Sequence, residues 1–506
     1  MKQLNVLVIE TDQQRYDCLG SSGNPFIRTP HLDALAAEGT VFTRHISANP
    51  VCQPSRCSLH TGLYTPAHGV YTNGIALNRR EYVNSHDITI EEPLTLADRF
   101  AAAGYDTAAF GKLHLTPNIE NDAREHQCPT YPESYAVMAA PAFRDWHGPY
   151  YGFRHVEFTG GHGEIPVTTG HYAQWLHDTA PDVYAEVLPH ANPYFSGGAE
   201  NRLKLPVAGQ QDLYPSKIPG ALHNTTWLAE RFIEYLQRGR RSDRPFFAYV
   251  GFPDPHHPFT PSFDIAAQFE GIPVKPPVDP TGEQIQGSIL LETVKRPPRV
   301  WSEEVLRYTY AMLYQVDLAA GQMMEALRQA GLWEDTLVVF TSDHGDFLGD
   351  HGLLYKSEVG SEALLHVPYI MRVPGRSLPS QVDIPMSNVD VLPTLLACAG
   401  VGSACDTHGE DITAHLTDDS RRVYAHCNNN TGPRQINYTL YDHEHRYTWY
   451  PFAERDELFD YRADPGEIRN LASNPAHAAL IADYRRQLAD SLVRHYNPIM
   501  GRIGIF

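Results

Sequence analysis

Strands and helices alternate along the first part of this 506-residue chain, and that alternation constrains the fold more than any other feature. A β-rich run at 4–9 precedes a helix at 30–39, and VFTRHIS (41–47) is the next expected strand. The helix TLADRFAAAG (95–104) likewise precedes the strand YDTAAF (105–110). The pattern predicts an α/β fold with a large, mainly parallel sheet flanked by helices.

The middle of the chain, roughly 115–220, is rich in Pro, Gly, His and Tyr and has no sustained period. We expect it to form long insertions over the sheet edge. Periodicity returns with the strand FFAYVGF (246–252), a long helix over 302–330 and a strand that ends at Asp343. The pattern changes again toward the C-terminus. We therefore expect a large domain over 1–395, which carries the candidate site, and a smaller α+β domain over 396–506.

Composition excludes several classes of protein. A formal net charge of −20 argues against a nucleic-acid partner, because phosphate backbones are bound by basic faces. Seven cysteines, an odd number without regular spacing, argue against a disulfide scaffold. No apolar run approaches the ~18–20 residues that span a bilayer. The chain opens with MKQLNVLVIETD, which is typical of a strand and not of a signal peptide. We expect a cytoplasmic protein without a membrane partner.

Two acidic residues lie at equivalent places in the expected sheet. Asp12 and Asp343 each follow the carboxyl end of a predicted strand. Ligands of open α/β sheets bind at those ends. Two carboxylates more than 300 positions apart are therefore expected to share one site.

Cys52 lies in the segment Val-Cys-Gln-Pro-Ser-Arg (51–56), which continues to Thr-Gly at 61–62. This motif resembles the sulfatase signature Cys-x-Pro-Ser-Arg followed by Thr-Gly, and LFDYRADPGEIRNL (458–471) resembles the C-terminal pattern of that family. An isolated cysteine is more often an inert thiol, but the full motif reverses that expectation. The resemblance implies an alkaline-phosphatase-like fold and oxidation of Cys52 to formylglycine by a separate formylglycine-generating enzyme. A helix that starts near Pro54 would favour an anion there.

The resemblance also implies a reaction, the hydrolysis of sulfate esters from R–O–SO₃⁻ to R–OH and sulfate. A hydrated aldehyde is a gem-diol with two hydroxyl groups. One attacks sulfur and forms a covalent sulfate ester, and the other, once deprotonated, expels sulfate and restores the aldehyde. A serine nucleophile would need water for that second step.

A distributed metal site is the second implication of the resemblance. In the family, a carboxylate pair or Asp-Gln after the first strand and Asp-Asn or Asp-His after a late strand hold one divalent cation. By resemblance the ligands here are Asp12, Gln13, Asp343, His344 and an oxygen of modified Cys52. Oxygen-rich ligation suits Ca²⁺, Mg²⁺ or Mn²⁺, and one imidazole shifts the balance slightly toward Mn²⁺. The resemblance places Ca²⁺ first. The cation would lower the pKa of the diol and neutralise the sulfuryl oxygens.

Five cationic or basic residues match further family motifs. Lys112 and His114 form a Gly-Lys-x-His segment after the strand YDTAAF, and His256, preferred over its neighbour His257, lies in Pro-His-His-Pro. By resemblance Arg56 and Lys112 stabilise the diol and the oxyanions, and His114 is the base that releases sulfate. His256 and Lys356 would bind the ester and assist the leaving oxygen.

Asn73 is a candidate substrate-binding residue, with an ordinary turn asparagine in Asn-Gly as the equally weighted alternative. The substrate is expected to be a small-molecule or carbohydrate sulfate ester, and a homo-oligomer stays open.

Two rival functions remain at this stage. The first is a phosphonate monoester or phosphodiester hydrolase with the same machinery. The Asp-Gln and Asp-His pairs resemble those of phosphonate monoester hydrolases and of some bacterial sulfatases more than those of well-known arylsulfatases. Lys112 and His114 argue for sulfate, because phosphonate hydrolases of this superfamily replace both with uncharged residues. The second rival is a catalytically silent sulfatase-like protein that only binds anions. It is disfavoured because every expected catalytic position is filled.

Overall fold

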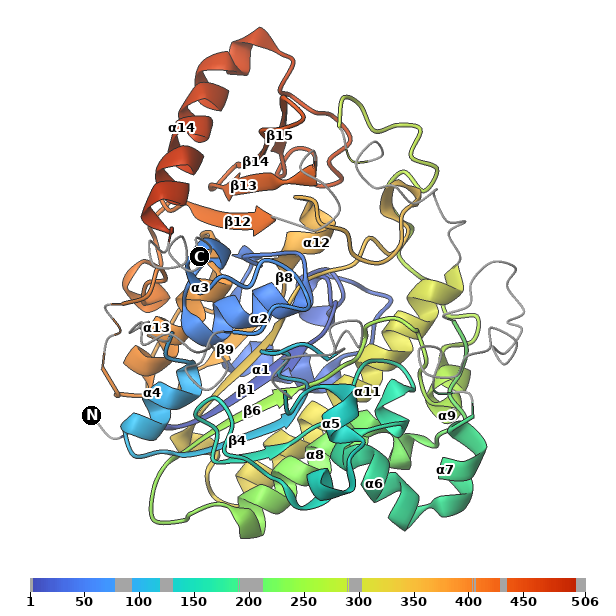
Figure 1. Cartoon of the computed structure of the whole chain (residues 1–506). Coiled ribbons are helices and arrows are strands. Elements are labelled where there is room, and N and C mark those ends of the chain that lie inside the picture. The colour runs from blue at the N-terminus through green and yellow to red at the C-terminus, as the bar shows by residue number, and fades with distance from the viewer. Residues whose placement is uncertain are drawn as a thin grey trace, which may run out of the picture.

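The computed structural model describes residues 3–77, 93–118, 131–189, 191, 213–288, 290, 303–402, 404, 406–427 and 435–496. Its centre is an eight-stranded sheet in the order β10-β2-β9-β7-β1-β6-β4-β5 (Figure 1). Pairing is parallel except where β9 meets β7 and β2. The strands are β1 (Asn5–Thr11), β2 (Thr40–Phe42), β4 (Asp106–Gly111), β5 (His155–Glu157), β6 (Phe246–Gly251), β7 (Thr336–Ser342), β9 (Tyr369–Arg372) and β10 (Gln381–Val382). The predicted fold class is therefore confirmed.

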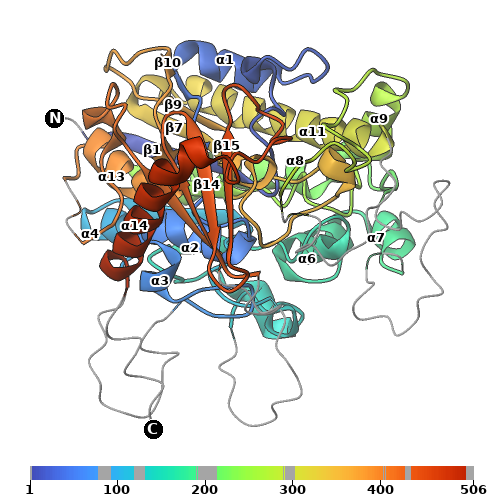
Figure 2. The same ribbon diagram turned by 90° about the horizontal axis from the view of Figure 1, so that it is seen from above.

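Helices cover both faces of this sheet because its central strands are apolar on both sides. Val6 and Val8 of β1 face one core, and Leu7 and Ile9 face the other. The first core is closed by α2 (Cys52–Thr61), α4 (Leu96–Ala102) and α13 (Asn388–Cys398). The second is closed by α1 (Pro30–Glu38), α8 (Asn224–Glu234) and α11 (Glu303–Gln329). Figure 2 shows α1 and α11 on one side of the strands and α2 and α13 on the other.

A second, antiparallel sheet forms in the C-terminal part of the chain. It contains β12 (Val423–Cys427), β13 (Asn437–Tyr441), β14 (His445–Tyr450) and β15 (Arg455–Asp460) in that order. Helix α14 (Ala478–Arg494) packs on one face, where Tyr484 and Leu488 meet Tyr447 and Leu458. The smaller α+β unit is thus present, and its boundary at 395/396 stays a prediction.

The structure differs from the expected elements in two places. The strand predicted at 41–47 is two short strands, since β2 joins the large sheet while β3 (His45–Ile46) pairs with β8 (His366–Val367) and β11 (Met386–Ser387). The middle segment contributes the edge strand β5 and the helices α6 (Gly170–Thr179) and α7 (Pro181–Val187). These helices are too short to produce a sustained period in the sequence. None of the described helices is long and apolar enough to cross a membrane.

Candidate active site

The ends of β1 and β7 bring two acidic loops together. Thr11 and Ser342 are partners in the parallel register, so Asp12 and Asp343 both follow the same edge of the sheet. The Asp343 amide donates to the Thr11 carbonyl over 3.2 Å. The Asp343 carboxylate in turn accepts from the Gln13 amide over 3.0 Å. Gln13 has φ of 69°, a left-handed conformation that costs energy for a non-glycine residue and persists here under these contacts.

Cys52 is the first residue of α2 and is 1% exposed. Its Sγ lies 2.9 Å from Lys356 Nζ, 3.2 Å from His344 Nε2 and 3.7 Å from an Asp12 carboxylate oxygen. Burial and the Asp12 charge raise the pKa of the thiol, but Lys112, Lys356 and His344 outweigh them, and the pKa lies below its ordinary value. Position 52 is therefore adapted to hold negative charge.

Four of the expected metal ligands converge on one point. One ligand atom each from Asp12, Cys52, Asp343 and His344 lies within 4.8 Å of the others, and all four residues are buried. His344 Nδ1 donates to the Gly345 carbonyl over 2.8 Å, which leaves the Nε2 lone pair directed at the cluster. Two carboxylates, one imidazole nitrogen and the nearby amide oxygen of Gln13 are a donor set that fits a divalent cation.

Asp346 determines which end of the Gln13 amide faces the cluster. Gln13 Nε2 donates to Asp346 over 2.5 Å, and its Oε1 lies 3.4 Å from Lys356 Nζ. An amide held by its nitrogen presents its oxygen to the site, as cation binding requires. We did not predict a role for Asp346, although its place in the Ser-Asp-His-Gly-Asp string was a usable signal.

Arg56 lies behind the carboxylates and is fully buried. Its Nε donates to Asp343 over 2.9 Å, and its Nη1 donates to Glu10 and Tyr249 over 3.2 and 2.8 Å. Burial raises the pKa of Glu10 to about 7, against the lowering effect of Arg56. Arg56 therefore orients the candidate ligand Asp343. A contact between Arg56 and the diol stays a prediction.

Lys112 and His256 are joined by a histidine that we did not single out, His162. Lys112 Nζ donates to Asp12 and to His162 Nε2, each over 2.5 Å. The His162 ring stacks on His256 with centroids 3.5 Å apart. Burial and Lys112 lower the pKa of His162 to about 3, so its ring is neutral. His162 lies in the aperiodic middle segment, where no sequence signal separated it from other histidines.

Lys356 completes the cationic side of the cluster. Its Nζ donates to His256 Nε2 over 2.7 Å. Although burial lowers the pKa of Lys356, Cys52 and Asp12 raise it above the ordinary value, so the amine is charged. His257 contacts Gln13 Nε2 instead, at 3.1 Å. The preference for His256 over His257 stays a prediction.

His114 and Asn73 lie around these groups. Burial, Lys112 and Arg56 hold the pKa of His114 well below its ordinary value, and its Nδ1 has no hydrogen-bond partner among the described residues. Asn73 Oδ1 accepts from the Gln53 amide over 3.1 Å, in the first turn of the helix that Cys52 begins. This bond gives Asn73 a structural task, and its contact with substrate stays a prediction.

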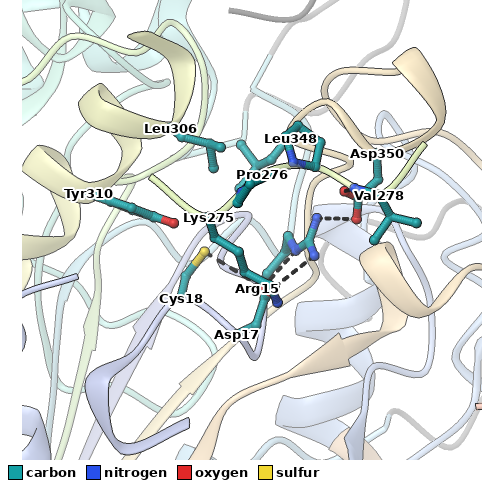
Figure 3. Close-up of a pocket in the computed structure, with 11 residues that line it drawn as sticks. Arg15, Asp17, Cys18, Lys275, Pro276, Val278, Leu306, Tyr310, Leu348 and Asp350 are labelled. Carbon is teal, nitrogen blue, oxygen red and sulfur yellow. Dashed lines mark hydrogen bonds and ion pairs between the residues drawn. The ribbon is translucent and has the colours of Figure 1, made fainter. Parts of the chain in front are cut away.

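A small pocket borders the loops that carry the ligands (Figure 3). Arg15 bridges it, pairing with Asp17 at 2.8 Å and with Asp350 at 2.6 Å, and Lys275 pairs with Asp17 at 2.8 Å. Burial raises the pKa of Cys18 far above the usual thiol value, so this thiol is inert. The charges of the lining residues are paired with one another. The Arg15–Asp350 ion pair connects the loop after β1 to the loop after β7.

Comparison with known proteins decides the family. A family model described as Sulfatase matches residues 4–401. The chain belongs to the sulfatase family. A second model, described as N-sulphoglucosamine sulphohydrolase, C-terminal, matches residues 349–494 of this sulfatase. The sulfatase is thus a hydrolase with an alkaline-phosphatase-like fold, as its motifs predict.

Individual relatives of the sulfatase span nearly the whole chain. The multifunctional alkaline phosphatase superfamily protein PehA of Trinickia caryophylli is 28% identical, over 98% of each chain. The arylsulfatase of Clostridium perfringens is 26% identical, over 96% of this chain and 93% of its own. The crystal structure of phosphonate monoester hydrolase of Agrobacterium radiobacter superposes with a TM-score of 0.72 at 25% identity, over 97% of this chain and 96% of its own. The secondary resemblance to phosphonate monoester hydrolases is confirmed.

Proposed function

We propose that this sulfatase hydrolyses sulfate esters to an alcohol and sulfate, using a formylglycine made from Cys52 and one divalent cation. The observation that carries the proposal is the surroundings of Cys52 Sγ, with Lys356 Nζ at 2.9 Å, His344 Nε2 at 3.2 Å and Asp12 at 3.7 Å. The thiol sulfur stands where the oxygens of a hydrated formylglycine would lie. A carboxylate, an imidazole and an ammonium group within reach of one atom are the surroundings that a metal-assisted nucleophile needs.

Both absent groups fit the residues present. Formylglycine at position 52 would supply the hydrated aldehyde, with one hydroxyl to attack sulfur and a second to expel sulfate. A cation held by Asp12, Gln13, Asp343 and His344 would supply positive charge beside the diol and the sulfuryl oxygens. The oxygen-rich donor set suits Ca²⁺, Mn²⁺ or Mg²⁺, and we place Ca²⁺ first on the family resemblance.

The basic residues around position 52 would stabilise negative charge and transfer protons. Lys112 and Lys356 flank position 52 and stabilise negative charge on the transferred group. Lys356 holds a proton at Nζ, and the hydrogen bond from Nζ to neutral His256 orients the amine. The amine is placed to donate this proton toward the leaving oxygen. His114, whose pKa is lowered by burial and by Lys112, has an Nδ1 without a hydrogen-bond partner among the described residues, and by resemblance it would accept the proton of the second diol hydroxyl.

The rival phosphonate or phosphodiester hydrolysis draws support from the structural similarity to a phosphonate monoester hydrolase. Lys112 and His114 favour sulfate, because the resemblance gives phosphonate hydrolases uncharged residues at both positions, and Lys112 Nζ donates to Asp12 of the cluster. The silent anion-binding alternative is disfavoured because every expected catalytic position is filled. We propose a carbohydrate or other small sulfate ester as substrate, and a formylglycine-generating enzyme as the partner in maturation.

The test combines mass spectrometry with a substrate panel. The Cys52 peptide of protein made with the modifying enzyme should lose the thiol mass and gain an aldehyde or its hydrate. Cys52→Ala should abolish activity, while Cys398→Ala, a change at a buried cysteine of α13, should retain it. Sulfated sugars, aryl sulfates, choline sulfate and phosphonate monoesters are compared by kcat/KM. A thiol that stays free, or a higher kcat/KM for the phosphonate, would overturn the proposal.

A further inference from the structure

A second group of potential metal ligands lies apart from the Cys52 cluster. One ligand atom each from His147, His155 and Glu157 lies within 4.8 Å of the other two. All three residues are half-buried, so an ion can reach them from solvent. None of them belongs to the candidate active site.

The edge of the large sheet creates this cluster. His155 and Glu157 are two positions apart on β5, so their side chains project from the same face. His147 is held beside them by its backbone, because its carbonyl accepts from the Val156 amide over 3.0 Å. The ring planes of His147 and His155 are 12° apart with centroids at 5.3 Å. The three side chains are thus brought together by the alternation of β5 and by one backbone hydrogen bond.

The hydrogen bonds leave nitrogen lone pairs available to an ion. His147 Nδ1 donates to the Val156 carbonyl over 3.2 Å, which leaves Nε2 as the unprotonated nitrogen. His155 Nε2 lies 3.1 Å from a Glu157 carboxylate oxygen. That separation is close to the ~3.3 Å edge of a tetrahedron with bonds of about 2.0–2.1 Å, so a metal ion can replace the shared proton.

The charge state of the cluster also suits a cation. Burial raises the pKa of Glu157, but the His155 contact outweighs it and lowers the pKa, so the carboxylate is ionised. A neighbouring histidine, His171, is fully engaged, since its Nδ1 accepts from the Phe158 amide and its Nε2 donates to the Trp146 carbonyl, both over 2.9 Å. Its ring stacks on His147 at 4.6 Å and fixes that ring without competing for the ion.

We propose that His147, His155 and Glu157 form a second metal site, specific for Zn²⁺ or a similar transition-metal ion. Two imidazoles and one carboxylate, with water as a fourth ligand, are a tetrahedral donor set that Zn²⁺ favours and Ca²⁺ does not. Beyond Glu157 the chain runs directly to His162, which contacts Lys112 and His256. An ion at this site braces β5 and so fixes the segment that delivers His162 to the active site.

Zinc titration of the whole protein tests the proposal. Protein freed of metal by chelation is saturated with Ca²⁺ and then titrated with Zn²⁺ by calorimetry, alongside Glu157→Gln and His155→Gln. We expect the wild type to bind about one more equivalent of Zn²⁺ than either variant, or to bind it at least tenfold more tightly, because the loss of even an outer-shell partner costs about 10–100-fold in metal affinity. His177→Gln removes an exposed histidine of α6 outside the cluster and should match the wild type.

A second measurement does not depend on the variants. Crystals of the wild type soaked in Zn²⁺ should give an anomalous peak about 2.0–2.2 Å from His147 Nε2 and a Glu157 oxygen. Equal zinc stoichiometry and affinity in the wild type and Glu157→Gln would refute the site. So would zinc-loaded crystals without a peak between these side chains.

Discussion

Lys356→Met removes the positive charge nearest to position 52 and keeps most of the volume of the side chain. Lys356 lies outside the Cys-x-Pro-Ser-Arg motif, so maturation of Cys52 should be unaffected. The ammonium group is 2.9 Å from Cys52 Sγ and 2.7 Å from His256 Nε2. We therefore expect the variant to fold and mature but to lose transition-state stabilisation.

The distance sets the size of the effect. Two unit charges 2.9 Å apart attract by about 6 kcal/mol at an effective dielectric constant of 20, which is an upper limit because the charge on the transferred group is spread over several oxygens. Loss of one preorganised donor to a developing oxyanion costs about 2.7–4 kcal/mol. We expect kcat/KM to fall by about 10²–10³-fold.

The assay compares two sulfate esters at equal formylglycine content, measured by peptide mass spectrometry. If Lys356 protonates the leaving oxygen, the loss should be greater for an alkyl sulfate than for 4-nitrophenyl sulfate, whose leaving group needs no proton. Lys275→Met, at the Asp17 ion pair in the pocket of Figure 3, is the matched control and should retain activity. A kcat/KM within threefold of the wild type for both esters would refute the assigned role.

Three further changes probe the groups around the cluster. Asp346→Ala frees the Gln13 amide to rotate, and cation affinity measured by calorimetry should fall about 10–100-fold, whereas unchanged affinity would exclude an orienting role. His162→Ala removes a ring stack worth about 0.5–1.5 kcal/mol, so kcat/KM should fall about 2–12-fold, and an unchanged value would show that His256 is held by other contacts. Burial raises the pKa of Asp317 to about 6 in the folded protein, from about 3.8 in the unfolded chain. Protonation of this carboxyl therefore stabilises the fold fully below pH 3.8, and this stabilisation is lost as the pH rises through 6. From pH 4 to pH 7 the urea-unfolding free energy of Asp317→Asn should therefore gain up to about 3 kcal/mol relative to the wild type, and a parallel pH dependence would contradict this.

The sequence predicted which residues gather around Cys52, but it did not predict the side chains that hold them in place. Asp12 and Asp343 follow strands whose apolar composition marks them as buried, and carboxyl ends of parallel strands share an edge, so their convergence followed from general rules. The position of Arg56 did not follow from those rules. Its contacts with Glu10 and Tyr249 depend on β6 lying beside β1, which no local pattern reveals.

Short elements were the least predictable part of the fold. The long helix α11 was expected within a residue or so of its observed ends, because 27 residues give a clear period. By contrast, the region at 41–47 was predicted as one strand, although its two halves pair with strands from the late part of the chain. His162 was missed for a similar reason, since its role depends on tertiary contacts with Lys112 and His256.

The order of the strands in the large sheet has a consequence for biosynthesis. β1 lies between β6 and β7, so the N-terminal strand has no neighbour until residues 246–251 have left the ribosome and gains its second only with residues 336–342. The surroundings that bury Cys52 include Lys356, which is made later still. An enzyme that oxidises this thiol must therefore reach it during synthesis or before the chain folds, because the finished fold leaves 1% of the residue exposed. The topology that assembles the site would thus also set a time limit on the proposed maturation.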